Sequence, residues 1–151
     1  MNDLELVTLE FESYFQHFEK QNYLVSKSPV GWQIDHSLKV INNIVLALKN
    51  SNPDDYKYNF NLKRSVIFFR KKIPRGVGKA PKSVRTFEKI TLEDLQSQFE
   101  NAKVIIKDLK ELNPKSNFKH PYFGRLNLKH TRFFLVLHTK HHLDIIKDIL
   151  N

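Results

Sequence analysis

The sequence predicts an all-α protein, an antiparallel four-helix bundle with one additional short helix. Five segments return an apolar residue every three or four positions, which places those residues on one stripe of a helix. No segment alternates apolar and polar residues over more than four or five positions, as a half-buried strand would. Amphipathic helices bury their stripes most simply against one another, so a single domain over residues 1–151 is expected.

The first two helices are predicted on either side of a polar linker. The stripe of the first consists of Leu4, Val7, Phe11, Tyr14 and Phe18. The stripe of the second consists of Ile34, Leu38, Ile41, Val45 and Leu48. Because proline cannot continue a helix, the second should end near Pro53.

Three further helices are predicted in the rest of the chain. A short one, closed by Pro74, has the stripe Leu62, Val66, Phe69 and Ile73. The next begins at Thr91, which can cap its first turn, and has the stripe Leu92, Leu95, Phe99, Ala102, Ile106 and Leu109. A loop over His120–Leu126 and a last helix over about Asn127–Leu150 follow. The connection Pro74–Ile90 is long, so we expect it to cross the bundle or to line the mouth of a site.

The composition restricts the chemistry. Cysteine is absent, which excludes disulfides, thiolate metal ligands, iron–sulfur clusters and a cysteine nucleophile. The amino terminus is acidic and amphipathic, unlike a secretory signal. The longest apolar run, Phe133–Leu137, is far shorter than the roughly 20 residues that span a bilayer. We therefore expect a cytoplasmic protein without a membrane segment, in which any metal site uses His, Asp or Glu.

The formal charge of +9 is concentrated in residues 63–89, which hold ten Lys or Arg and a single acid, Glu88. Two interpretations stay open. The charges could solubilise a loop, or they could form a patch for nucleic acid or another anionic partner. Only Phe87 could stack on a base between Arg70 and Lys89, and no helix-turn-helix or RNA-module signature is present, which disfavours nucleic acid.

Two histidines lie in the apolar stripe of the last helix. His138 and His142 are four residues apart, on the same face as Phe134, Ile145 and Ile149. Side chains at this spacing stand one above the other about 5–6 Å apart, so both imidazoles can reach one metal ion. The alternative is that both are hydrogen-bonded core histidines, although two in one stripe are costly to bury.

A third ligand should come from another helix. Apart from His17, His36 is the only histidine inside any other predicted helix. His36 lies just beyond the edge of the apolar face of its helix. Periodicity alone therefore fits an exposed His36 as well as a His36 that binds a metal.

Four short segments resemble segments of the DinB/YfiT-like superfamily. Gly31-Trp-Gln-Ile-Asp-His36-Ser-Leu resembles the segment that carries the first metal histidine of that family, and His138-Thr-Lys-His-His142-Leu resembles its H-x-x-H-H segment. His120-Pro-Tyr-Phe-Gly-Arg-Leu, together with Gly78-Lys-Ala-Pro81, is similar to a less characterised branch.

The resemblance implies a four-helix bundle whose mouth holds a divalent metal, often zinc or nickel, bound by His36, His138 and His142. Some relatives transfer low-molecular-weight thiols, many have no assigned activity, and dimers are common. Relatives often carry Gln three residues after the paired histidines, where this chain has Ile145, so no contact of that Gln can be carried over.

An open position on a three-histidine metal is typical of a catalytic site. The leading interpretation is therefore a metal-dependent enzyme, a thiol-dependent S-transferase or a hydrolase acting on a small molecule, with His141 as a candidate base. Candidate substrate-binding residues are Lys79, Lys82, Arg85, Tyr122 and Trp32. Two alternatives remain: a non-enzymatic protein that binds an anionic partner through residues 63–89, and a bundle that keeps its histidines only as packing.

Overall fold

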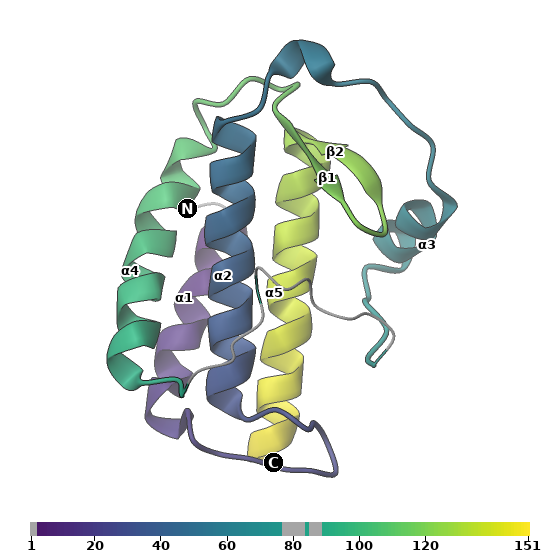
Figure 1. Ribbon diagram of the computed structural model, residues 1–151. Coiled ribbons are helices and arrows are strands. Elements are labelled where there is room, and N and C mark those ends of the chain that lie inside the picture. Colours follow the sequence, from purple (N-terminus) through teal and green to yellow (C-terminus); the bar gives the residue numbers. More distant parts are fainter. Residues whose placement is uncertain (1–2, 77–83, 85–88) are drawn as a thin grey trace.

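Four helical segments pack side by side along the long axis of the molecule (Figure 1). The computed structural model describes residues 3–76, 84 and 89–151. The packed segments are α1 (Asp3–Leu9), which continues as the 3-10 helix η1 (Glu10–His17), α2 (Val30–Lys49), α4 (Leu92–Asp108) and α5 (Leu128–Leu150). The smaller elements are η2 (Pro53–Asp55), α3 (Leu62–Arg70) and the strands β1 (Asn117–His120) and β2 (Gly124–Asn127). The prediction of a helical protein is confirmed.

The directions of the helices differ from the antiparallel prediction. Lys49 at the end of α2 pairs with Asp108 at the end of α4, and Asp35 near the start of α2 accepts a hydrogen bond from Gln98. These contacts show that α2 and α4 run parallel, and Figure 1 shows α5 running the opposite way. The long connection between α2 and α4 explains this, because it returns the chain to the end at which α2 began.

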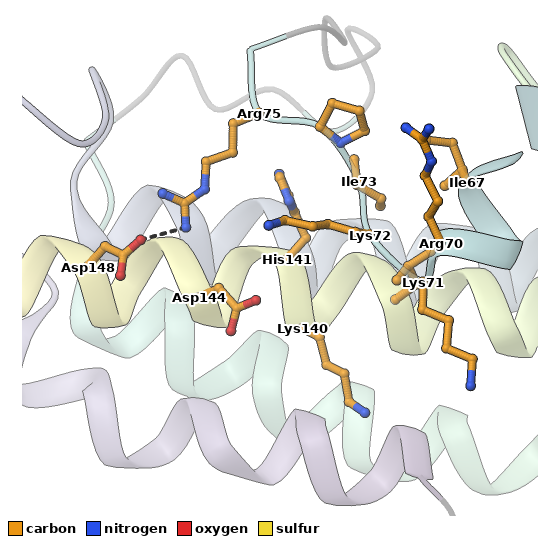
Figure 2. Close-up of a pocket in the computed structure, with 12 residues that line it drawn as sticks. Ile67, Arg70, Lys71, Lys72, Ile73, Arg75, Lys140, His141, Asp144 and Asp148 are labelled. Carbon is orange, nitrogen blue, oxygen red and sulfur yellow. Dashed lines mark hydrogen bonds and ion pairs between the residues drawn. The ribbon is translucent and has the colours of Figure 1, made fainter.

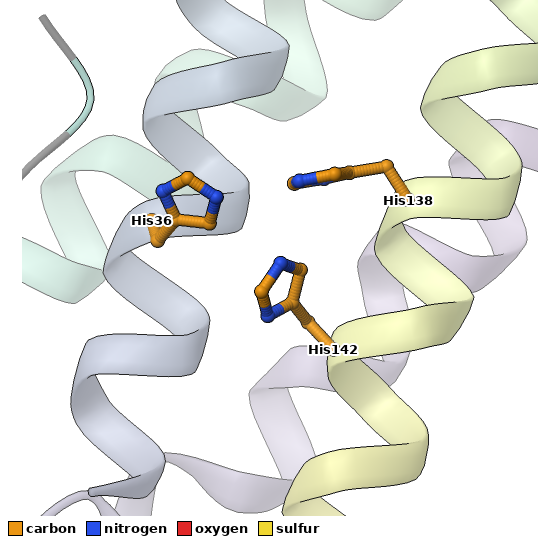
Figure 3. Close-up of side chains that lie close together, drawn as sticks. All are labelled: His36, His138 and His142. Carbon is orange, nitrogen blue, oxygen red and sulfur yellow. The ribbon is translucent and has the colours of Figure 1, made fainter. Parts of the chain in front are cut away.

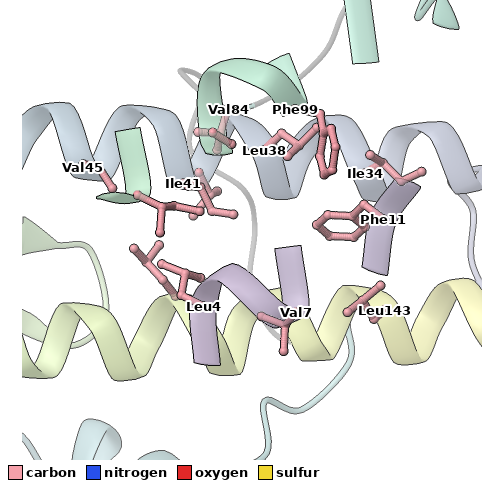
Figure 4. Close-up of a cluster of buried hydrophobic side chains, with 14 of the residues drawn as sticks. Leu4, Val7, Phe11, Ile34, Leu38, Ile41, Val45, Val84, Phe99 and Leu143 are labelled. Carbon is pink, nitrogen blue, oxygen red and sulfur yellow. The ribbon is translucent and has the colours of Figure 1, made fainter. Parts of the chain in front are cut away.

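Most of the core comes from the apolar stripes predicted for the first, second, fourth and last helices (Figure 4). All five stripe residues of α2 are fully buried, and they meet Phe11 from η1, Phe99 from α4 and Leu143 from α5. Each fully buried aliphatic or aromatic side chain contributes about 1.5–3 kcal/mol relative to its exposed state. The start of α4 is also as predicted: Thr91 and Asp94 form a reciprocal capping box.

The stripe predicted for the third helix is wrong. The helix ends at Arg70 rather than at Ile73, with Lys71 in the left-handed region at φ 50°, and Leu62 and Phe69 are 67% and 89% exposed. The buried residue of α3 is instead Arg64. Its guanidinium donates to the backbone carbonyls of Asn59 and Phe123, at 2.5 and 3.3 Å, and thus secures α3 to the segment before α5.

The segment predicted as a loop before α5 is an antiparallel β-hairpin. β1 and β2 pair from Asn117 opposite Asn127 to His120 opposite Gly124. The strands are only four residues long, which is too short for a period-2 pattern to stand out. The turn ends at Gly124, whose φ of +71° favours glycine. Among the described residues, no helix is long and apolar enough to cross a membrane.

The hairpin turn provides a test of this fold. In Gly124→Ala the new Cβ would lie 2.2 Å from Nδ2 of Asn59, whereas in Gly76→Ala, at a similar φ of +73°, it would meet nothing within 4 Å. Both variants should lose about 1–2 kcal/mol of unfolding free energy to left-handed backbone strain. We expect Gly124→Ala to lose clearly more in urea denaturation, and equal losses would show that Asn59 does not confine the turn.

Candidate metal centre

Three histidines from two antiparallel helices converge at one point (Figure 3). His36 comes from the second turn of α2, and His138 and His142 come from the middle of α5. One ring nitrogen of each residue lies within 4.8 Å of the corresponding nitrogen of the other two. The i, i+4 spacing on α5 gives the pair on one face, as the sequence predicts, and the packing of α2 against α5 adds the third.

The backbone and a glutamine orient two of the three rings. Nδ1 of His36 donates to the carbonyl of Val84 at 3.1 Å, and Nδ1 of His142 donates to Oε1 of Gln33 at 2.7 Å. Because the amide nitrogen of Gln33 donates to Ser26 Oγ at 3.1 Å, its oxygen is turned toward His142. With the proton held on Nδ1, both rings have a free lone pair on Nε2, as a metal ligand requires.

The spacing of the ring nitrogens fits a transition metal after a small contraction. Nitrogens bound tetrahedrally to zinc at about 2.1 Å stand roughly 3.4 Å apart, so the rings need to approach by no more than about 1.4 Å. His138 lacks an orienting partner of this kind. Its Nδ1 is enclosed and has no hydrogen-bond partner among the described residues, as is also true of Nδ1 of His130 outside the cluster.

Burial keeps the three imidazoles uncharged. Desolvation lowers the pKa of His36, and it lowers the pKa of His138 and of His142 well below the usual value, with further lowering by the neighbouring histidines. Asp35, which precedes His36 by one residue, is turned away and engages Lys39 and Gln98. The neutral imidazole is the form that binds a metal, so the site is prepared for a cation at neutral pH.

The histidines open into a cavity of about 600 Å³. Its wall is mainly apolar and includes Ile44, Ala47, Phe118 and Phe134. No Asp or Glu is found among its described lining residues. The cavity is therefore suited to a small, largely apolar ligand that is neutral or anionic, and the described lining offers histidines as bases close to the cluster.

Trp32 and Tyr122, both predicted to contact substrate, line this cavity. The indole of Trp32 is stacked on the ring of His36, with centroids 4.9 Å apart and 7° between the planes. Lys79, Lys82 and Arg85 lie outside the described residues. Val84 lies against His36, so the predicted long connection lines the site at this described residue.

His141, the candidate base, lies beside the three-histidine cluster. Its ring meets His142 edge-on at 5.1 Å and forms a hydrogen bond with the backbone of Ile73. Burial and the charge of Arg75 lower the pKa of His141. The residue therefore stays largely uncharged at neutral pH and can accept a proton.

His141 also lines a second hollow, between the segment after α3 and the outer side of α5 (Figure 2). Arg70, Lys71, Lys72 and Lys140 surround this hollow, and their charged ends point in different directions. Arg75 pairs with Asp148 at 2.7 Å. Since Arg64 is also buried, the basic segment does not present all its charges to one partner.

The prediction of the site missed Gln33, Val84 and His120. Gln33 belongs to the motif that contains His36, but nothing in the sequence places it beside His142, 109 positions away. Val84 acts through its backbone carbonyl, which no sequence pattern marks. His120 was noted only as part of a loop motif, and it lies in the cavity wall.

Comparison of the chain with family models, with curated proteins and with solved structures finds no match. The candidate site is therefore defined by its geometry.

The protonation of the buried histidines predicts how stability changes with pH. In the metal-free protein the unfolded chain takes up protons below pH 6.5, the usual histidine pKa, before the folded chain does. Stability is thus fully present above pH 6.5 and is lost as the pH falls toward the lowered folded pKa values. The urea midpoint should decrease between pH 7.5 and 5.

His138→Leu provides the matched variant for this measurement. It replaces an orphaned ring with an apolar side chain, so we expect an unchanged or higher stability of the metal-free protein at pH 7.5 and a weaker dependence on pH. A wild-type midpoint that is flat or rises on acidification would contradict the buried, neutral state of the cluster.

Proposed function

We propose that this chain is a metal-dependent enzyme whose His36, His138 and His142 hold a divalent ion, most suitably zinc or nickel. The observation that carries the proposal is the convergence of three uncharged imidazoles in the wall of a cavity, two of them with Nδ1 engaged so that Nε2 is free. Three nitrogen ligands and no carboxylate favour a transition metal over magnesium or calcium.

The chemistry follows from the open position and from the cavity. When bound, the metal would supply Lewis-acid activation of a thiol or of water. His141 is placed to accept the released proton, since no carboxylate is found among the described residues of the cavity wall. Trp32 covers one face of His36, and the mainly apolar wall offers contact area to the carbon skeleton of a substrate.

We further propose that the reaction is a thiol-dependent S-transfer or a hydrolysis, within a four-helix DinB/YfiT-like fold. The resemblance of the motifs around His36 and His142 supports the assignment to that superfamily. The absence of cysteine means that a nucleophilic thiol would come from a low-molecular-weight cosubstrate. The cavity of about 600 Å³ has the size of a small-molecule site.

The metal site can be tested by elemental analysis of protein prepared without a histidine tag. We expect close to one zinc or nickel per chain in the wild type and almost none in His138→Ala. His130→Ala is the matched control, because His130 is on the same helix but outside the cluster, in contact with Phe68. Equal metal content in all three proteins would contradict the assignment.

Gln33 is expected to act on the metal through His142. Gln33→Leu removes the acceptor of the Nδ1 proton, and loss of such a partner typically weakens metal affinity 10- to 100-fold. Gln33→Glu keeps an oxygen acceptor and should restore most of the affinity. Competition with a chromophoric zinc chelator gives both values, and an affinity unchanged in Gln33→Leu would show that the hydrogen bond does not position the ligand.

A further inference from the structure

His120 turns one nitrogen toward the backbone of its own hairpin. Its Nδ1 accepts hydrogen bonds from the amides of Tyr122 and Phe123, both at 3.1 Å. A ring nitrogen that accepts two hydrogen bonds carries no proton, so the neutral imidazole must carry its proton on Nε2. The turn therefore fixes the tautomer of His120, and this tautomer is opposite to that of His36 and His142.

The ring of His120 is held tightly within the cavity wall. It stacks on Phe123 with centroids 4.4 Å apart and 10° between the planes, and it meets Phe134 edge-on at 4.7 Å. Phe134 in turn lies 5.4 Å from the ring of His138. His120 thus shares the cavity with the candidate metal ligands. No partner for its Nε2 is found in the part of the chain that the structure describes.

The turn that carries His120 is itself anchored. Nδ2 of Asn61 donates to the carbonyl of Tyr122 at 3.1 Å, and Arg64 donates to the carbonyl of Phe123. Gly124 provides the positive φ that closes the turn. A donor mounted on so constrained a turn loses little conformational entropy when it binds, which is the advantage of a preorganised site.

We propose that His120 is a substrate-positioning residue, which presents its Nε2–H as a hydrogen-bond donor to an acceptor oxygen of the ligand bound in the cavity. This inference rests on the proposed function and adds to it the substrate class: a small, largely apolar molecule with a carboxylate or carbonyl oxygen some distance from the atom that reaches the metal. Burial lowers the pKa of His120 to about 4, so the residue stays neutral and donates without carrying charge.

A role limited to the turn is the alternative. An asparagine side chain can accept the same backbone amides, since it commonly caps turns of this kind. His120→Asn therefore keeps the cap and removes the donor at the position of Nε2, which the shorter asparagine amide does not reach. The variant thus separates the two roles. Its urea midpoint and circular dichroism should stay close to those of the wild type.

The binding test uses cobalt(II)-loaded protein, whose absorption changes when a ligand reaches the metal. The probes are acetate and the linear dicarboxylates from malonate to adipate. Acetate should bind equally to the wild type and to His120→Asn. At least one dicarboxylate should bind about 10- to 100-fold more weakly to the variant, as expected for a lost hydrogen bond to a charged oxygen. His130→Asn should match the wild type throughout.

The outcomes separate a failure of the inference about His120 from a failure of the proposed metal site. If the variant and the wild type bind every probe alike, His120 is a turn cap and the inference is overturned. Failure of cobalt to bind would count against the proposed function, and nitrogen-15 NMR of the metal-free protein then decides on His120 alone. A proton on Nε2 supports the inference, whereas a proton on Nδ1 overturns it.

Discussion

The packing of α2 against α5 is the contact on which the rest of the site depends. These helices run antiparallel, which brings Gln33 level with His142 and His36 level with the pair on α5. The hydrogen bond from His142 to Gln33 joins the helices through a buried polar contact beside the three-histidine cluster. A shift of one turn would separate both pairs and leave polar atoms unsatisfied, so the same contact fixes the register of the helices and the geometry of the centre.

Burial of the three imidazoles lowers the stability of the metal-free fold. Burying three imidazoles forces them to remain neutral, and the orphaned Nδ1 of His138 has no compensation among the described residues. A structural role alone would be served better by leucine or phenylalanine at the same positions, as elsewhere in the core. Buried residues that lower the stability of the core and lie close together in space are typical of functional sites. The binding energy of a metal would offset the cost of burial.

Helical periodicity predicted the main helices and the His138–His142 pair because both depend on contacts within one helix. The inclusion of His36 came from the resemblance, since its place at the edge of a stripe did not distinguish a ligand from an exposed side chain. The stripe of α3 was wrong because Arg64 takes its place as the anchor, through bonds to backbone carbonyls that no pattern encodes. The hairpin, the parallel course of α2 and α4, and the role of Gln33 depend on contacts between distant segments, which a single sequence does not specify.

The proposed metal centre consists of the imidazoles of His36, His138 and His142 around one ion. X-ray absorption spectroscopy of the zinc-loaded chain is the decisive measurement, because it reports the number and type of ligands together with their distances. We expect three imidazole nitrogens at about 2.0–2.1 Å and a light atom in the remaining position. A shell of oxygens, or one with fewer than three imidazoles, would rule out this centre.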